Sequence, residues 1–412
     1  MKKLLKFLLG ATLVFGVLPK SGFSVTEWLK TQKNQEETTY EQVVEEGVFV
    51  AQTDGKVDLQ TSAKSAYLID FGTHTLIYAH NETKRLPIAS MCKIMTLLLS
   101  FDAIKEGALD MNEEICVSER AASMGGSQVF LEANAKYSVR ELLKSIVVCS
   151  ANDSCVAMAE RLSGSESIFV DKMNEKAKEI GASNTLFANC TGLPKEPQYS
   201  CAKDVAIMLK NLLFHEEYYE FGKVWMDKFQ HPKGRYTEIA NTNKLVRFYD
   251  GCDGGKTGFT SEAGFCLAAT AKRNDMRIIS VVIGEESSAK RFDDVRTMFD
   301  YAFANYMNKT IIEGGKPLED AVSVSGGKVK TIAVYPERTA YSFERRGERA
   351  EISVEMTYNR LKAPIRQGEK VGEAIVFKNG VECDRVPLLA SESVKKANFF
   401  DHFREIARAW NG

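Results

Sequence analysis

The chain has 412 residues, of which 44% are hydrophobic, and its formal net charge is −1. This length can bury one large core and a smaller one, and a charge near zero gives no electrostatic argument for binding nucleic acid. No P-loop, dinucleotide-binding glycine motif or zinc-ligand cysteine spacing occurs, so we expect neither a cofactor nor a metal.

The first 24 residues have the pattern of a secretory signal peptide. Lys2, Lys3 and Lys6 precede an apolar run over residues 7–18, and Gly22-Phe23-Ser24 offers a small-x-small cleavage site. The apolar run is shorter than the roughly 20 residues that a transmembrane helix needs, and an uncleaved N-terminal anchor is the alternative. We therefore predict an exported protein.

Nine cysteines are scattered along the chain. Exported proteins commonly form disulfides, but an odd count without regular spacing argues against a complete disulfide framework. We expect most of these residues to be small and buried, with reduced thiols. A bridge between Cys149 and Cys155 is the pairing that the sequence leaves open.

Residues 25–48 are polar and rich in glutamate, which indicates a linker. Strand patterns, a block of helical patterns and further strand patterns then follow. The predicted strands cover 66–70, 75–79, 264–270 and 277–283, and the predicted helices begin at Ser90 and Ser138 or cover 167–180 and 289–307. Asn274-Asp275 provides the turn of an antiparallel hairpin. This order indicates an α+β domain over residues 49–312, with helices packed on an antiparallel sheet.

Two of the predicted helices have further signals. The helix that begins at Ser90 is apolar on most sides, which predicts burial. Ser138 and Glu141 have the S-x-x-E spacing of a capping box in front of an apolar run.

Beyond residue 312 the patterns are again those of β-structure, and we expect a small all-β domain over residues 313–390. Asn379-Gly380 offers a hairpin turn. One predicted strand has alternating apolar positions, as on a half-buried strand. These positions are Ile352, Val354, Met356 and Tyr358.

The segment from Val394 to Trp410, within the last region 391–412, has the pattern of an amphipathic helix. One face carries the apolar residues Phe399, Phe400, Phe403, Ile406, Ala407 and Trp410. Such a helix packs on its own domain, pairs with a partner or lies in a membrane interface. The pattern alone gives similar weight to packing on its own domain and to a membrane.

Ser90 and Lys93 are the first candidates for chemistry. Residues at i and i+3 share a helix face, so the hydroxyl and the amine would meet at the first turn. A serine needs a base to become a nucleophile, and a lysine can be that base when burial or another cation lowers its pKa. The N–H groups of the helix N-terminus suit a developing oxyanion. Alone, this spacing is common by chance, and a capping serine beside a surface lysine explains it better.

Two further motifs change this interpretation. Ser150-Ala151-Asn152 follows an apolar helical pattern that ends at Cys149, and Lys256-Thr257-Gly258 precedes the predicted hairpin. The set S-x-x-K, S-D-N and K-T-G is that of penicillin-binding proteins and class A β-lactamases, and Ala151 makes the second motif the looser S-x-N form. The three motifs occur in this order in helix, loop and strand contexts, which indicates one active site.

With these motifs the chain resembles the low-molecular-mass penicillin-binding proteins that act as serine D-alanyl-D-alanine carboxypeptidases, the peptidase S11 type. Residues 126–128 (GSQ), 189–194 (NCTGLP) and 251–267 (GCDGGKTGFTSEAGFCL) also look like blocks of that family. The resemblance covers nearly the whole chain. It implies a transpeptidase domain like that of penicillin-binding proteins and β-lactamases, an all-β domain, and a C-terminal amphipathic helix on the outer face of the cytoplasmic membrane.

The resemblance also implies the catalytic roles. Ser90 would attack the carbonyl between the two terminal D-alanines of a peptidoglycan pentapeptide, Lys93 would take its proton, and Ser150 would relay a proton to the leaving amine. The backbone N–H groups of Ser90 and Phe259 would form the oxyanion hole. Water would then hydrolyse the acyl-enzyme, and β-lactams would bind covalently at the same serine.

The remaining motif residues would bind the substrate, again by resemblance. Asn152 would bond to the peptide and help orient Lys93. Lys256 would attract the terminal carboxylate and lower the pKa of Lys93, and Thr257 would donate a hydrogen bond to that carboxylate. Gly258 would leave room for the substrate along the strand edge.

The sequence departs from the family pattern at two places. Relatives often carry histidine at the position of Phe259, where the expected contact is through the backbone. An arginine that some relatives carry upstream of K-T-G is replaced within residues 241–245 (NTNKL), which removes one expected contact to the substrate carboxylate.

Three alternatives share the motifs. A β-lactamase needs a deacylating glutamate, and Glu196 is the only glutamate within residues 183–200. A DD-endopeptidase would use the same site, and a non-catalytic wall-binding protein would keep only the fold. None of the five histidines lies in a nucleophile motif, and we assign them no role.

Overall fold

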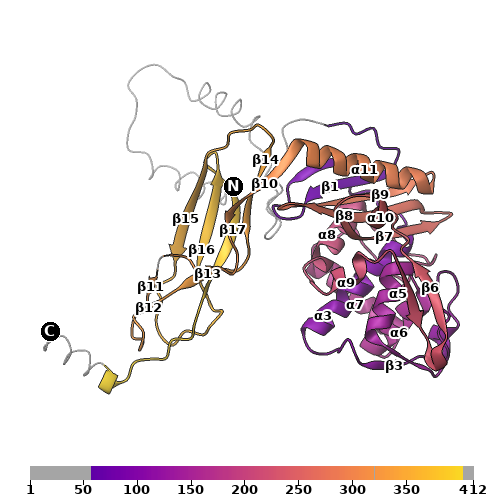
Figure 1. Cartoon of the computed structure of the whole chain (residues 1–412), viewed down its shortest axis with the longest axis horizontal. Coiled ribbons are helices and arrows are strands. Elements are labelled where there is room, and N and C mark those ends of the chain that lie inside the picture. The colour runs from indigo at the N-terminus through magenta and orange to yellow at the C-terminus, as the bar shows by residue number, and fades with distance from the viewer. Residues whose placement is uncertain (1–56, 320, 402–412) are drawn as a thin grey trace, which may run out of the picture. The chain divides into compact units, whose positions relative to one another are not determined.

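The structure is a computed structural model that describes residues 57–319 and 321–401 (Figure 1). The predicted signal peptide, the linker over 25–48 and most of the predicted C-terminal helix lie outside the described residues.

A five-stranded antiparallel sheet forms the centre of the first part, with the strand order β2-β1-β9-β8-β7. Its strands are β1 (Ser65–Asp70), β2 (Leu76–His80), β7 (Cys252–Thr260), β8 (Gly264–Arg273) and β9 (Met276–Glu285). Because β7 is an edge strand, one side of its backbone is free to pair with another chain.

Both faces of this sheet are buried because neighbouring residues of a strand point to opposite faces. In β1, Tyr67 and Ile69 join the core beneath the helical block, whereas Ala66 and Leu68 join the core beneath α11 (Ser288–Asn305). Figure 1 shows α11 along one side of the sheet and the helical block on the other. The strands therefore read as almost continuous apolar runs.

The helical block is built from α3 (Lys93–Lys105), α5 (Val139–Cys149), α6 (Asn152–Ser163), α7 (Glu166–Glu179) and α8 (Ala202–Leu212). Shorter elements connect them: η1 (Ala89–Cys92), α4 (Glu119–Ala122), α9 (Tyr218–Gly222), η2 (Pro232–Gly234) and α10 (Leu245–Phe248). Two small antiparallel pairs complete this part: β3 (Glu114–Cys116) with β4 (Lys136–Ser138), and β5 (Met226–Gln230) with β6 (Tyr236–Ala240).

Several predicted local signals are confirmed. The Ser138 hydroxyl accepts the N–H of Glu141 at 3.2 Å, so the capping serine begins α5. β8 and β9 form the predicted hairpin, with Asn274 in the left-handed region at φ 52°. One boundary differs, because Ser90 lies in the 3₁₀ helix η1 and the α-helix begins only at Lys93.

The second part is made of β-strands. A two-stranded pair joins β10 (Tyr306–Ile312) to β14 (Ala340–Arg345), and a short pair joins β11 (Val322–Ser323) to β12 (Thr331–Ile332). A four-stranded sheet has the order β13-β17-β16-β15. Its strands are β13 (Val334–Pro336), β15 (Ile352–Tyr358), β16 (Lys370–Lys378) and β17 (Val381–Ala390).

The predicted turn of this second part is confirmed, because Asn379 and Gly380 connect β16 to β17 with φ values of 51° and 78°. The prediction of a half-buried strand is wrong for the end of β15. Met356 and Tyr358 are 40% and 38% exposed, since β15 is an edge strand and the core lies beside its first half.

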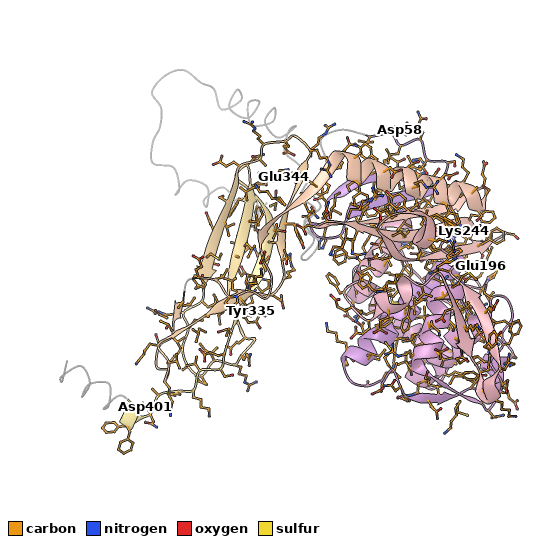
Figure 2. The ribbon with its side chains drawn as sticks, in the orientation of Figure 1. Asp58, Glu196, Lys244, Tyr335, Glu344 and Asp401 are labelled. Carbon is orange, nitrogen blue, oxygen red and sulfur yellow. The ribbon has the colours of Figure 1, made fainter. Side chains whose placement is uncertain are left out.

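The C-terminal helix begins later than the sequence pattern predicts. Val394 is buried and pairs with Ile365, so the chain is extended there. The helix begins at Phe399, after a reciprocal cap in which the side chains of Asn398 and Asp401 each accept the other residue's N–H at 2.9 Å. Figure 2 labels Asp401 at this end of the described chain. The residues after Asp401 lie outside the described range.

The nine cysteines, which all lie within the described residues, are free thiols. The Cys149 thiol donates to the Ser145 carbonyl at 3.2 Å, and the Cys155 thiol donates to the Cys190 carbonyl at 3.0 Å. The bridge between Cys149 and Cys155 that the sequence left open is therefore not formed. A separate search of residues 57–319 and 321–401 finds no helix long and apolar enough to cross a membrane.

A carboxyl pair joins the end of β9 to α11. Burial and a hydrogen bond with Asp294 raise the pKa of Glu285 to about 7. Asp294 also accepts hydrogen bonds from the Thr61 hydroxyl at 2.7 Å and the Ser62 N–H at 3.0 Å. The folded protein therefore holds a proton on Glu285 at a pH where the unfolded chain releases it.

We expect Glu285→Gln to remove part of the pH dependence of stability. A pKa that is raised in the folded state stabilises the protein below the unfolded pKa, and this stabilisation is lost as the pH rises through about 7. Glutamine keeps a donor toward Asp294 but does not titrate, so the variant should gain about 1–2 kcal/mol over the wild type between pH 5 and pH 8. Calorimetric unfolding at both pH values measures this gain, and an equal pH dependence in both proteins would contradict the assignment.

Candidate active site

Ser90 lies in η1, at a point where three backbone segments meet closely. Ala89 before it has φ 47°, which is rare for a residue other than glycine. A Cβ on Gly258 of β7 would lie 2.6 Å from the Ile88 oxygen and 3.2 Å from the Ser90 nitrogen, and a Cβ on Gly192 would lie 2.0 Å from the Ala89 oxygen. Glycine at these two positions therefore allows β7 and the 189–194 loop to approach the serine.

Lys93 begins α3 and is completely buried. Its Nζ donates to Ser90 Oγ at 3.1 Å and to the Thr191 carbonyl at 2.5 Å. Burial lowers the pKa of Lys93, and no ion pair to a carboxylate of a described residue offsets this effect. The structure thus places an amine that can lose its proton against the hydroxyl of Ser90.

Lys256 of β7 is the second buried amine, and its Nζ donates to the Thr257 carbonyl at 3.0 Å. Burial first, and then the charge on Lys93, lower the pKa of Lys256 well below its usual value. Two buried cations near each other disfavour each other's charge. The close approach of Gly258 to the Ser90 nitrogen places the K-T-G motif beside the S-x-x-K motif.

Ser150 ends α5 in the left-handed conformation, with φ 65°. Its hydroxyl is buried and has no hydrogen-bond partner among the described residues, and the same holds for Asn152 Oδ1. A buried polar atom without a partner costs about 1–3 kcal/mol. A bound substrate that forms hydrogen bonds with Ser150 Oγ and Asn152 Oδ1 would offset this cost.

Asn152 is held by the 125–127 segment rather than by Lys93. Its Nδ2 donates to the Gly125 carbonyl at 2.8 Å, and its N–H donates to the Ser127 carbonyl at 2.7 Å. No hydrogen bond between Asn152 and Lys93 occurs in the described structure, so that part of the expectation is not met. The Thr191 carbonyl holds the lysine amine instead.

The sequence analysis did not single out Thr191, because its contribution is a backbone carbonyl. Asn189 Oδ1 shapes this loop by accepting the N–H groups of Thr191 and Gly192 at 3.1 and 2.7 Å. In the sequence, residues 189–194 resemble a block of the family, but this resemblance assigns no role to Thr191.

Thr257 faces a second hydroxyl that the sequence analysis also missed. Its Oγ1 donates to Thr242 Oγ1 at 2.8 Å. Thr242 lies in the 241–245 segment, where an expected arginine is replaced, and its N–H donates to the Val148 carbonyl at the end of α5. The wall beside K-T-G therefore carries two hydroxyls and is tied to the helix end that precedes Ser150.

The side chain of Phe259 lies at the surface beside a second aromatic ring. Its side chain is 55% exposed and stacks on Phe265 with ring centroids 4.3 Å apart. From the other side of β7, the buried Arg291 of α11 donates to the Gly258 carbonyl at 3.1 Å. Nothing in the sequence pattern marked Arg291, which lies 35 residues after Lys256.

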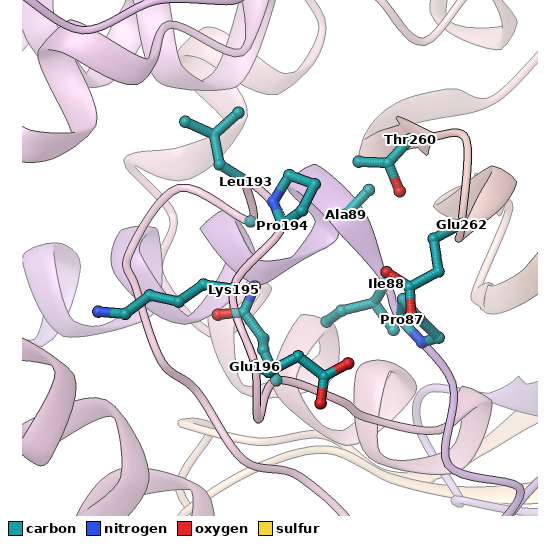
Figure 3. Close-up of a pocket in the computed structure, with 11 residues that line it drawn as sticks. Pro87, Ile88, Ala89, Leu193, Pro194, Lys195, Glu196, Thr260 and Glu262 are labelled. Atoms are coloured by element: carbon teal, nitrogen blue, oxygen red, sulfur yellow. The ribbon is translucent and has the colours of Figure 1, made fainter.

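A pocket of about 250 Å³ opens beside Ala89, between the 192–196 loop and the end of β7 at Thr260 and Glu262 (Figure 3). Glu196 lines the pocket, and Figure 3 shows the Lys195 side chain pointing away from Thr260 and Glu262.

Two of the described histidines, His215 and His231, bond to structural neighbours. His215 bonds to Asp102 at 2.9 Å, and His231 bonds to Tyr137 at 3.1 Å and to Thr237 at 2.8 Å. Within residues 57–319 and 321–401, no group of three or more His, Cys, Asp or Glu side chains could hold a metal ion.

Comparison with known proteins agrees with this geometry. Residues 50–287 match the model of the peptidase S11 family, D-alanyl-D-alanine carboxypeptidase, and residues 306–396 match the model of the penicillin-binding protein 5 C-terminal domain. The D-alanyl-D-alanine carboxypeptidase DacF of Bacillus subtilis is 40% identical over 367 residues, which are 87% of this chain and 93% of that protein.

Two solved structures extend the likeness. Penicillin-binding protein 5 from Haemophilus influenzae is 28% identical with a TM-score of 0.66, covering 83% of this chain and all of that one. Penicillin-binding protein D2 from Listeria monocytogenes, in an ampicillin-bound form, is 30% identical with a TM-score of 0.54, covering 60% of this chain and all of that one. The chain therefore belongs to the D-alanyl-D-alanine carboxypeptidase family of low-molecular-mass penicillin-binding proteins.

Proposed function

We propose that this protein is a serine D-Ala-D-Ala carboxypeptidase that removes the terminal D-alanine of peptidoglycan stem peptides. The observation that carries the proposal is the buried amine of Lys93, 3.1 Å from the hydroxyl of Ser90 and without a carboxylate partner among the described residues. A general base must lie within hydrogen-bond reach of the proton that it takes, and this pair satisfies that condition.

In the first step, Lys93 takes the hydroxyl proton while Ser90 Oγ attacks the carbonyl of the penultimate D-alanine. The oxygen of that carbonyl becomes an oxyanion, which the N–H groups of Ser90 and Phe259 would bind. The close approach of Gly258 to the Ser90 nitrogen supports this assignment.

Collapse of the tetrahedral intermediate expels D-alanine, whose amine needs a proton. Ser150 is suited to relay that proton because its hydroxyl is buried and has no partner among the described residues. Asn152 Oδ1, which likewise has none, would accept an N–H group of the bound peptide. Water then attacks the ester on Ser90 and releases the shortened peptide.

The terminal carboxylate of the substrate would bind at Lys256 and at the hydroxyls of Thr257 and Thr242. Burial opposes the charge on Lys256, and a carboxylate would stabilise that charge. A charged Lys256 in turn favours the neutral form of Lys93. Substrate binding would therefore help to prepare the base, and the Thr242 hydroxyl would replace the missing arginine contact.

The expected location is the outer face of the cytoplasmic membrane. The signal-like residues 1–24 would direct export, and the C-terminal helix would bind the membrane surface. Phe399 and Phe400 begin this helix and are 77% and 71% exposed, as expected for side chains that enter a membrane interface.

We expect Ser90→Ala to abolish covalent labelling by a β-lactam. Intact-mass and peptide mass spectrometry should show one adduct on the Ser90 peptide of the wild type, and the adduct should persist for minutes or longer. Ser100→Ala is the matched control, because Ser100 is a buried serine of α3, the helix that follows η1, and its hydroxyl donates to the Thr96 carbonyl of that helix. Rapid loss of the adduct would favour a β-lactamase, and labelling of Ser90→Ala would contradict the proposal.

The rate of acylation should rise with pH and level off below pH 10.5. Lys93 can take a proton only in its neutral form, and burial lowers its pKa, so the acidic limb lies below the ordinary value for lysine. Lys93→Met should lower the acylation rate by about a hundredfold or more. Stopped-flow acylation across pH measures both effects, with Lys105→Met at the end of the same helix as control. A limb that continues past pH 10.5 would exclude Lys93 as the base.

The double variant Phe399→Asp/Phe400→Asp should bind anionic lipid vesicles much more weakly than the wild type in a flotation assay. Two carboxylates at the start of the helix oppose insertion of its apolar face. Val381→Asp is the control, since Val381 is a 59% exposed apolar residue on β17. Equal flotation of the double variant would argue against anchoring by this helix.

A further inference from the structure

Arg291 is a buried cation for which the described residues supply no carboxylate. It lies on α11 with 8% of its surface exposed. Its Nη1 donates to the carbonyls of Gly258 and Cys266 at 3.1 and 3.4 Å, and its Nη2 donates to the Ser288 hydroxyl at 3.4 Å. Its Nε is buried and has no partner among the described residues. Burying a charge without a counter-ion costs free energy. Other interactions must therefore stabilise the buried guanidinium of Arg291.

Two aromatic rings partly compensate for this cost. The guanidinium carbon lies 5.5 Å from the ring centroid of Phe265 and 4.9 Å from that of Phe292, within the range of cation–π attraction. Burial lowers the pKa of Arg291 to about 10, so the group stays protonated at neutral pH. A full positive charge thus points at the backbone of β7.

The carbonyl that Arg291 binds belongs to a particular peptide group. The Gly258 carbonyl and the Phe259 N–H are the two ends of one planar unit and point in opposite directions in a trans peptide. Arg291 holds the carbonyl end on the α11 side of this unit. The N–H end is the donor that the proposed function places in the oxyanion hole, and Gly258 adjoins the nitrogen of Ser90.

We propose that Arg291 is a positioning residue for the oxyanion hole, acting through the Gly258–Phe259 peptide. This inference rests on the proposed function, which makes the Phe259 N–H an oxyanion donor. A charged donor on the carbonyl polarises the peptide group and strengthens its N–H as a donor, because linked hydrogen bonds reinforce one another. The same bond fixes the direction of that N–H before the substrate arrives, which is the form of stabilisation that costs no reorganisation during the reaction.

The alternative is a purely structural role, in which Arg291 only fastens α11 to the sheet. If Arg291 only fastens α11, its replacement should lower the stability of the protein and leave the carbonyl stretching frequency of the acyl-enzyme unchanged. A polarising role predicts a weaker hydrogen bond to the carbonyl oxygen of the acyl-enzyme, and hence a higher stretching frequency of that carbonyl. The two roles therefore differ in a spectroscopic signal as well as in rate.

The test compares Arg291→Met, Arg291→Lys and the control Val295→Ala. Methionine keeps apolar length without donors, and lysine restores one charged donor. Val295 is fully buried in the core beneath α11, so its truncation weakens the packing of the same helix without touching the Gly258 carbonyl. Each protein is acylated with a β-lactam that carries a ¹³C-labelled lactam carbonyl, which makes the ester band visible by infrared difference spectroscopy.

We expect Arg291→Met to slow acylation by about tenfold or more, less than the loss of a whole oxyanion donor, and to move the ester band to higher wavenumber. Arg291→Lys should recover part of both effects, whereas Val295→Ala should lower the melting temperature and leave the band in place. An unshifted band and an unchanged acylation rate in Arg291→Met would overturn the inference. If Arg291→Met does not fold, Arg291→Gln decides, because glutamine removes the charge and keeps a polar side chain. An unshifted band and an unchanged acylation rate in Arg291→Gln would overturn the inference as well.

The outcome also separates this inference from the proposed function. A wild type that forms no ester on Ser90 would overturn the proposed function and this inference with it. A wild type that is acylated normally, beside an Arg291→Met variant with the same rate and band, would overturn the inference alone.

Discussion

The chemistry of this site depends on burying a lysine amine against a serine hydroxyl without giving it a carboxylate. A carboxylate partner would raise the pKa of Lys93 and keep its proton in place. The fold instead offers it neutral groups, the hydroxyl of Ser90 and the carbonyl of Thr191, so that burial lowers its pKa. The core beneath the helical block, which includes the neighbouring Cys92 and Ile94, keeps water away from this completely buried amine.

Unfavourable local conformations occur in two of the segments that form the site. Ala89 and Ser150 both have positive φ values, at 47° and 65°, and residues other than glycine rarely adopt them. Gly192 and Gly258 allow approaches that a Cβ would block. Strain of this kind persists only where the surrounding structure over-determines it, and here packed helices and the edge of the sheet do so.

Much of this site can be predicted from the sequence because its motifs are defined by side chains. Ser90, Lys93, Ser150, Asn152 and the K-T-G triplet were found from their identities and order, and the hairpin turns followed from local backbone chemistry. The rest was hidden for physical reasons. Thr191 acts through a carbonyl that any residue could supply, and Arg291 reaches the site only because α11 packs across the sheet. The late start of the C-terminal helix depends on pairing between Val394 and Ile365, a tertiary contact that overrides periodicity.

Three polar groups of the site bear on the choice of substrate. Ser150 Oγ and Asn152 Oδ1 have no partners among the described residues, and the charge on Lys256 is opposed by burial and by Lys93. Under the proposed function, a peptide that ends in a free carboxylate would satisfy all three at once: it would offer an N–H group to Asn152, a leaving amine to Ser150 and a counter-ion to Lys256. A chain that continued past the cleaved residue would place a neutral amide there and leave the charge on Lys256 uncompensated. Because an uncompensated buried charge costs several kcal/mol, the geometry favours removal of a terminal residue over cleavage within a chain.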